Sequence, residues 1–118
     1  MNEEKLRQEF IEKKRGEILL ELEAYLKEMG NPMTIEYVLA QVLEDSGDDA
    51  FDDLIVMLSE SDDVPDPETA QEFAMELFNY FPRKSLGGKS FAETISFEKL
   101  KKMDEDFQKF KDGVPSGE

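Results

Sequence analysis

Residues 18–43 decide the fold class, and they read ILLELEAYLKEMGNPMTIEYVLAQVL. Apolar residues recur here every three or four positions, which is the spacing that lines one face of an α-helix. The stripe that begins at Ile18 stops at Gly30, and Pro32 prevents the helix from continuing. Thr34 then suits the N-cap of a second helix with the same spacing. This stretch therefore predicts two amphipathic helices joined by a tight turn.

Start and stop signals extend this pattern over the rest of the chain. Asn2 can cap the first helix, and Asp66 before Pro67 and Glu68 begins another, because Asp caps well and Pro suits the first helical position. Ser90 and Glu93 form the spacing of a capping box. Asp48 or Asp49 and Ser96 are the expected caps of the third and the last helix.

No segment shows the alternating pattern of a strand, so the sequence predicts an all-α fold. We expect a single compact orthogonal or irregular bundle of five to six helices with a long N-terminal helix. Residues 1–111 form one helical domain in this prediction, because the chain is too short for a second core. Residues 112–118 are expected to be a flexible tail.

The first helix carries apolar residues on two different faces. Leu6 and Phe10 fall away from the stripe that contains Ile11 and Ile18 when positions advance by 100° per residue. Three explanations stay open: a kink at Gly16, repacking within the monomer, or contact of Leu6 and Phe10 with a partner. The last of these predicts a homodimer through the N-terminal helix.

The net charge of −15 arises from 29 acidic and 14 basic residues in 118. Between Glu28 and Pro82 the chain has 15 acidic residues and no Lys or Arg. Such a field repels nucleic acid and anionic lipid, whereas it attracts proteins with a basic surface. We therefore expect an unidentified protein partner with a basic surface, and neither direct nucleic acid binding nor a membrane contact. A solvated acidic face that only keeps the protein soluble is the alternative.

The sequence contains neither Cys nor His, which removes disulfides, thiolate nucleophiles and imidazole bases. No apolar run approaches the ~18 to 20 residues of a membrane span, and we expect a cytoplasmic protein. Every acidic residue lies in a charge-rich stretch, so no carboxylate is expected to have the perturbed pKa of a catalytic acid. We predict no catalytic residue, no cofactor, no metal ligand and no enzyme activity.

Four acidic residues around the start of the third helix form a candidate interaction site. They are Asp48, Asp49, Asp52 and Asp53. The nearby Gly47 stands in the wrong place for an EF-hand loop, and like charges one turn apart repel each other by a few tenths of a kcal/mol. A basic partner or a cation would relieve this repulsion, although solvated acids at a helix start explain the same pattern.

A second candidate interaction site is the loop before the capping box. It contains Arg83, Lys84, Leu86, Gly87, Gly88, Lys89 and Ser90. The end of this segment is similar to a phosphate-binding loop, but Arg83 stands where that motif needs Gly, and the segment before it reads as helix instead of strand. A left-handed turn at the two glycines followed by the Ser90 cap explains the loop structurally.

The string from Leu86 to Ser90 resembles a segment of bacterial antitoxins of the Xre/MbcA/ParS type, over about residues 68–114. The resemblance implies toxin binding by Lys89, Ser90 and their neighbours. The chain departs from the family in three ways: Phe91 replaces the family's Pro, Trp is absent and no helix-turn-helix is recognisable.

The sequence is consistent with three competing hypotheses about function. A non-enzymatic protein-protein interaction module or regulator is the leading hypothesis, and an antitoxin-like regulator that binds a cognate toxin is its rival. A metal-dependent enzyme built on carboxylates is the third.

Overall fold

The computed structural model describes residues 2–44, 49–60 and 67–111, and within them the chain forms five α-helices and two short 3-10 helices. The α-helices are α1 (Glu3–Met29), α2 (Ile35–Glu44), α3 (Ala50–Ser59), α4 (Pro67–Tyr80) and α5 (Phe97–Lys111). The 3-10 helices η1 (Lys84–Leu86) and η2 (Phe91–Thr94) connect α4 to α5. The predicted all-α bundle with a long N-terminal helix is confirmed, and the predicted tail 112–118 lies outside the described residues.

Capping groups explain where several helices begin and end. Asn2 Oδ1 accepts a hydrogen bond of 3.0 Å from a backbone N–H in the first turn of α1, and Thr34 Oγ1 accepts one of 3.1 Å in α2. α1 ends at Gly30, whose φ of 70° lies in the left-handed region that glycine adopts easily. Asp49 is the N-cap of α3 without a side-chain cap bond, and the predicted cap Asp66 is not among the described residues.

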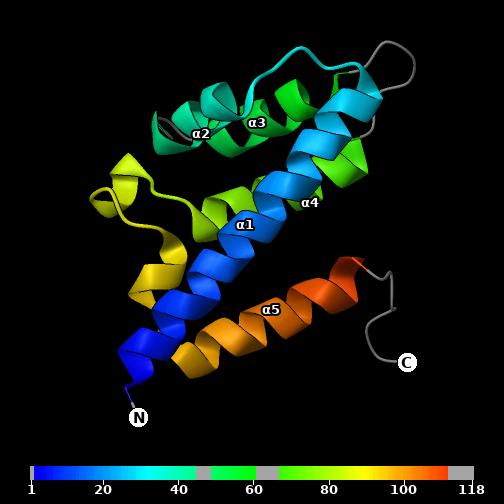
Figure 1. Cartoon of the computed structure of the whole chain (residues 1–118). Helices are drawn as coiled ribbons and strands as arrows, with labels where there is room; N and C mark the ends of the chain where they lie inside the picture. Colours follow the sequence, from blue (N-terminus) through cyan, green and yellow to red (C-terminus); the bar gives the residue numbers. More distant parts are fainter. Residues whose placement is uncertain (1, 45–48, 61–66, 112–118) are drawn as a thin grey trace.

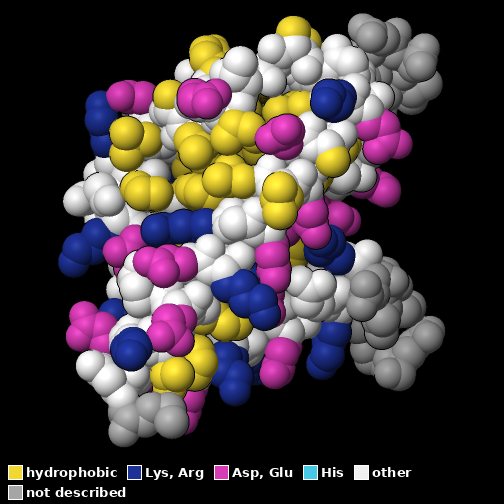
Figure 2. All heavy atoms as spheres, viewed as in Figure 1, with side chains coloured by type: hydrophobic (Ala, Val, Ile, Leu, Met, Phe, Trp, Pro, Cys, Tyr) yellow, Lys and Arg dark blue, Asp and Glu magenta, His cyan; other side chains and the backbone are white. Residues whose placement is uncertain are grey.

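α1 organises the bundle. Figure 1 shows it as one straight rod, with α2 and α3 against its C-terminal half, α5 beside its N-terminal half and α4 behind it. In the same view, Figure 2 shows hydrophobic side chains gathered over α2 and the adjoining part of α1, whereas charged side chains dominate the half that holds α5. The molecule thus exposes an apolar region on the side of its acidic helices.

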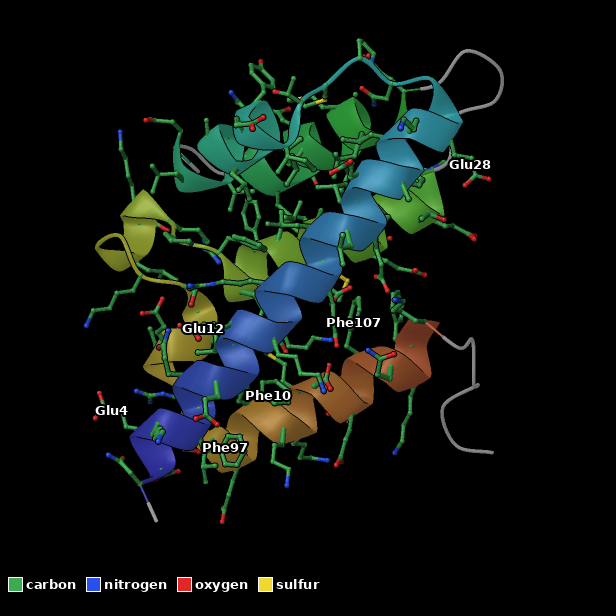
Figure 3. All side chains as sticks on the ribbon, viewed as in Figure 1. Glu4, Phe10, Glu12, Glu28, Phe97 and Phe107 are labelled. Atoms are coloured by element: carbon green, nitrogen blue, oxygen red, sulfur yellow. The ribbon has the colours of Figure 1, made fainter. Side chains whose placement is uncertain are left out.

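The displaced apolar residues of α1 pack within the chain. The Phe10 ring lies 6.2 Å from the Phe97 ring in an edge-to-face contact, and Leu6 is half-buried. Figure 3 shows Phe10 and Phe97 together where α1 meets α5. Because α1 continues straight through Gly16, repacking on α5 explains the second apolar face without a kink. The homodimer through α1 stays a prediction.

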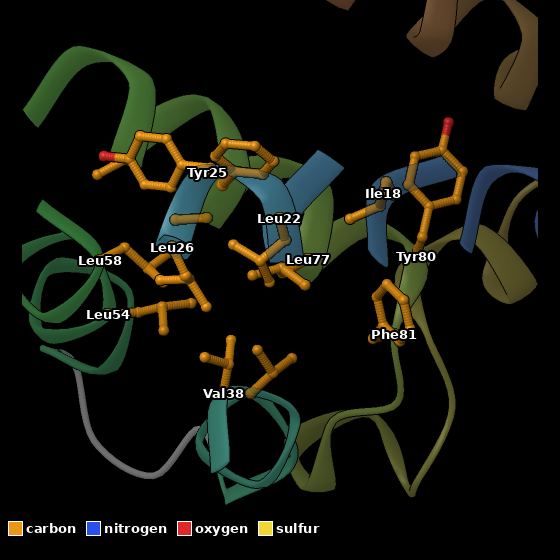
Figure 4. Close-up of a cluster of buried hydrophobic side chains, with 14 of the residues drawn as sticks. Ile18, Leu22, Tyr25, Leu26, Val38, Leu54, Leu58, Leu77, Tyr80 and Phe81 are labelled. Atoms are coloured by element: carbon orange, nitrogen blue, oxygen red, sulfur yellow. The ribbon is translucent and has the colours of Figure 1, made fainter. Parts of the chain in front are cut away.

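The core forms where α1 meets α2, α3 and α4. Figure 4 shows Leu22 and Leu26 of α1 among Val38 of α2, Leu58 of α3 and Leu77 of α4. Each is almost entirely removed from water, which contributes about 1.5 to 3 kcal/mol per side chain. α5 adds its own buried side chains on the other side of α1, so α1 is held from both sides.

Candidate functional site

We call α2, α3 and α4 together the acidic unit, because their sequences contain no Lys or Arg. The exposed acidic side chains of these helices are Glu36, Glu44, Asp52, Asp53 and Glu68. α3 and α4 are packed against each other and α2 packs on both, so these carboxylates are held on one rigid body.

The predicted acidic cluster lies at the start of α3. Asp49, Asp52 and Asp53 are all exposed. Asp52 and Asp53 lie in the first turn of α3, where the positive end of the helix dipole stabilises negative charge. Asp48 lies outside the described residues. Among the side chains that the structure describes, no group of three or more acids is arranged to hold a metal ion.

A groove with a volume of about 560 Å³ separates the C-terminal half of α1 from the start of α2. Apolar side chains line it, namely Leu19, Leu20, Leu26, Met33 and Ile35. Glu23, Lys27 and Glu36 also line it and place charge along its walls. Ile35 and Glu36 belong to α2, so one wall of the groove is part of the acidic unit.

The turn between α1 and α2 fixes the width of this groove. The amide of Asn31 is buried, and its Nδ2 donates to the Met57 carbonyl at 3.0 Å, while its Oδ1 accepts from the Met33 N–H at 3.0 Å. The bond to Met57 ties the turn to α3, and the bond from Met33 fixes the backbone of the turn itself. We therefore expect the groove to exist before any partner binds.

A buried ion cluster joins α1, α4 and α5. Lys14 Nζ lies 3.5 Å from Glu76 Oε2 and 2.9 Å from Asp104 Oδ1. The side chains of Lys14 and Glu76 are only 10% and 5% exposed, so these charges depend on each other for compensation. The cluster therefore links α1, α4 and α5 through charges that compensate one another.

Burial sets the ionisation of the groups in this cluster. It opposes the charged form of Lys14, but the Asp104 and Glu76 carboxylates outweigh it and raise the pKa of Lys14. Burial also raises the pKa of Glu76, against the attraction of Lys14. The pKa of the Tyr80 hydroxyl is raised by burial and by both carboxylates. This hydroxyl has no hydrogen-bond partner among the described residues, and Figure 4 shows it pointing away from the leucine core.

A second cavity, of about 340 Å³, lies between α1, α4 and the end of α5. The rings of Tyr25 and Phe73, whose centroids are 4.9 Å apart, form part of its wall. Lys111 lines it from α5 and lies 3.9 Å from the Glu21 carboxylate. The chain thus places one of its own ammonium groups at this acidic cavity.

The loop with the two glycines has the predicted structure, a left-handed turn followed by a helix cap at Ser90. Gly87 and Gly88 have φ of 70° and 83°, and the Arg83 and Lys89 backbones pair as an isolated bridge. Ser90 is fully buried and forms the capping box with Glu93. Lys89 and both glycines are exposed, whereas Leu86 is half-buried.

Both basic residues before the glycines are already engaged within the chain. Arg83 Nη1 donates to the Phe78 carbonyl at 3.1 Å, and its guanidinium stacks 4.7 Å from the Phe78 ring centroid. Lys84 forms an exposed ion pair with Glu44 of α2. The structure thus separates the predicted loop residues into an exposed tip and an anchored base.

Arg15 anchors this loop to α1. Its Nε donates to the Tyr80 carbonyl at 2.6 Å, and its Nη2 donates to Glu93 Oε1 at 3.0 Å and more weakly to Ser90 Oγ. Although partial burial opposes ionisation, hydrogen bonds from Ser90 and the Arg15 guanidinium hold the pKa of Glu93 below its ordinary value of 4.5.

The lowered pKa of Glu93 predicts a pH-dependent stability difference. Because the carboxylate is favoured in the folded state, its stabilisation is complete above pH 4.5 and is lost as the pH falls through the lower folded pKa. Glu93→Gln should therefore be less stable than the wild type at neutral pH, with a deficit that shrinks in acid. Urea unfolding of both proteins over a pH series measures this difference, and a deficit independent of pH would contradict it.

Neither Lys14 nor Arg15 is among the candidate residues that the sequence predicts, and the structure places both in contacts between helices. Lys14 is buried because it lies on the same helical face as Ile11 and Ile18. The spacing contained the signal, since Glu76 falls in the same way between Phe73 and Tyr80 of α4. Opposite charges on two apolar faces indicate that the two faces meet.

No family model, curated protein or solved structure matches the chain. None of the described helices is both long and apolar enough to cross a membrane. The acidic unit, the groove and the loop are therefore the features that bear on function.

Proposed function

We propose that the chain is a non-enzymatic protein-interaction module whose acidic unit docks a partner with a basic surface. The observation that carries this proposal is the absence of Lys and Arg between Glu28 and Pro82. The exposed carboxylates of this segment are held on three packed helices, so their field has a fixed direction. Such a field speeds the encounter with a cationic partner and orients it before contact.

Exposed apolar side chains on the same helices support a protein partner over a small cation. Tyr37 and Leu43 of α2 are 51% and 37% exposed. A single exposed ion pair contributes about 0 to 1 kcal/mol, so specific affinity also needs apolar contact that excludes water. The acidic unit offers both kinds of contact side by side.

Two charge-matched variants test the proposal. The first neutralises acids of the acidic unit, with Glu36→Gln, Asp52→Asn, Asp53→Asn and Glu68→Gln. The second neutralises exposed acids elsewhere, with Glu9→Gln, Glu12→Gln, Glu98→Gln and Glu105→Gln. A partner captured with tagged protein and identified by mass spectrometry is purified, and its Kd is measured for each variant at low and high salt.

The first variant should weaken binding by about tenfold, since four lost contacts of a few tenths of a kcal/mol approach 1.4 kcal/mol. It should also reduce the salt dependence, whereas the second variant should bind within about twofold of the wild type. Equal effects of both variants, or a Kd that salt does not change, would contradict docking through the acidic unit.

An antitoxin-like regulator is the second candidate. It is favoured by the exposed loop tip at Gly87, Gly88 and Lys89, since Arg83 anchors the base of this loop to the Phe78 carbonyl. The resemblance implies a toxin contact at Ser90 too, but this side chain is fully buried and could act there only through the shape of the loop. Co-purification with the product of an adjacent gene, lost in Lys89→Glu, would support this function, and an isolated gene without such a product would oppose it.

A further inference from the structure

We infer that the groove between α1 and α2 binds an amphipathic helix of a partner protein, and that the polar flanks of this helix carry Lys or Arg. This inference rests on the proposed function, because it names the segment of a basic partner that is recognised. It adds a specific apolar surface to the charge attraction, and the two are tested by different variants.

The shape and lining of the groove suit the apolar face of a helix. Its walls come from two helices, and its apolar lining includes Leu19 of α1 with Met33 and Ile35 of the next segment. Helical ligands bind such grooves through residues spaced three or four positions apart. The Asn31 bonds fix the turn that connects the two walls, so a partner would not have to order this turn.

Leu20 marks the edge where a partner would bind. It lines the groove and is 74% exposed, the largest exposed fraction among the big hydrophobic side chains that the structure describes as exposed. Gly16 lies one turn before it on the same face of α1. Nothing lies within 4 Å of a Cβ built at Gly16, so packing within the chain does not require glycine there. A bare turn next to Leu20 lets another backbone approach α1 closely.

The charges around the groove select the flanks of the docked helix. Glu23 and Glu36 stand on opposite walls, and Lys27 is the one basic residue among the described side chains that line the groove. Glu36 also belongs to the acidic unit, so the groove continues into its negative field. Lys and Arg on the flanks of the docked helix complement this rim, and their long stems cover apolar surface. Two copies of this chain, each with a net charge of −15, repel each other instead.

The experiment uses the full chain and a fluorescent synthetic peptide of leucines and lysines arranged as an amphipathic helix. A peptide of the same composition without an apolar face is the control for charge attraction alone. Two protein variants are compared, Leu20→Glu in the groove and Val56→Glu on the exposed face of α3. Both replace an exposed aliphatic side chain by glutamate, so they have the same net charge.

The amphipathic peptide should bind the wild type at least about tenfold more tightly than the control peptide. Leu20→Glu should weaken its binding by about tenfold although the added negative charge alone would strengthen it, whereas Val56→Glu should not weaken it. Amide chemical-shift changes on peptide addition should centre on Met33 and Ile35, which checks the site even if a variant unfolds.

Equal binding of both peptides, equal effects of both variants, or shift changes elsewhere would overturn the inference. Sedimentation as a dimer that Leu20→Glu disrupts would assign the groove to a second copy and would also overturn it. If the peptide affinity does not change with salt but still depends on Leu20, the proposed docking through the acidic unit is wrong, whereas the groove remains the binding site.

Discussion

Lys14→Met should lower the free energy of unfolding by about 3 to 5 kcal/mol, because it removes the cation that compensates two carboxylates at the α1–α4–α5 junction. The Glu76 side chain is 5% exposed and has little access to water as a substitute. Methionine fills a similar volume, so the loss reports the charge and not a cavity. Urea or thermal unfolding measures it.

Two control variants separate this effect from a general change in charge. Lys13→Met removes the same charge from the exposed neighbouring position and should change stability by no more than about 0.5 kcal/mol. The double variant Lys14→Met with Glu76→Leu should be more stable than Lys14→Met, since it removes the buried anion as well. Equal losses in Lys13→Met and Lys14→Met would show that the cluster is not a coupled unit.

Arg15→Met should destabilise the fold by about 2 to 3 kcal/mol, because the Tyr80 carbonyl and Glu93 lose a charged donor. The expected loss is smaller than for Lys14→Met, because the Glu93 side chain is 30% exposed to water and still accepts hydrogen bonds from Ser90. In Arg15→Met, amides of the loop between α4 and α5 should exchange hydrogen faster than in the wild type. Amides in the core of α3 should lose less protection.

Lys84→Met provides the matched comparison for Arg15. Its ion pair with Glu44 joins side chains that are 60% and 56% exposed, so we expect a loss below about 1 kcal/mol. A loss as large as that of Arg15→Met would mean that charge on the loop, and not the Arg15 anchor, stabilises it. The comparison also shows which loop residues can be changed in binding experiments without disturbing the fold.

Much of the helical architecture could be predicted from local signals. Asn2, Thr34 and Ser90 cap where the spacing places them, and Gly30 ends α1 in the left-handed conformation. These features depend on a few neighbouring residues, and helix capping acts within one turn. They could therefore be predicted without knowledge of the tertiary structure.

The candidate site could be predicted only in part. The acidic bias of α2 to α4 is a property of composition, but the groove beside it depends on how α1 and α2 cross. Leu20 falls opposite the buried stripe of Ile18, Leu22 and Tyr25, so helical periodicity alone already predicts that it is exposed. Periodicity does not show that Met33 and Ile35 come to lie beside it, because this depends on how α1 and α2 pack.

The sequence by itself determined an all-α fold with a long N-terminal helix, the caps at Asn2, Thr34 and Ser90, and an acidic segment without a basic residue, because periodicity, capping and charge are local quantities. Only the tertiary structure decided that Phe10 packs on Phe97, that Lys14 meets Glu76 and Asp104, and that α1 and α2 leave an apolar groove open. These contacts join segments far apart in the chain, and they form because burying apolar surface brings the matching faces and their charges together.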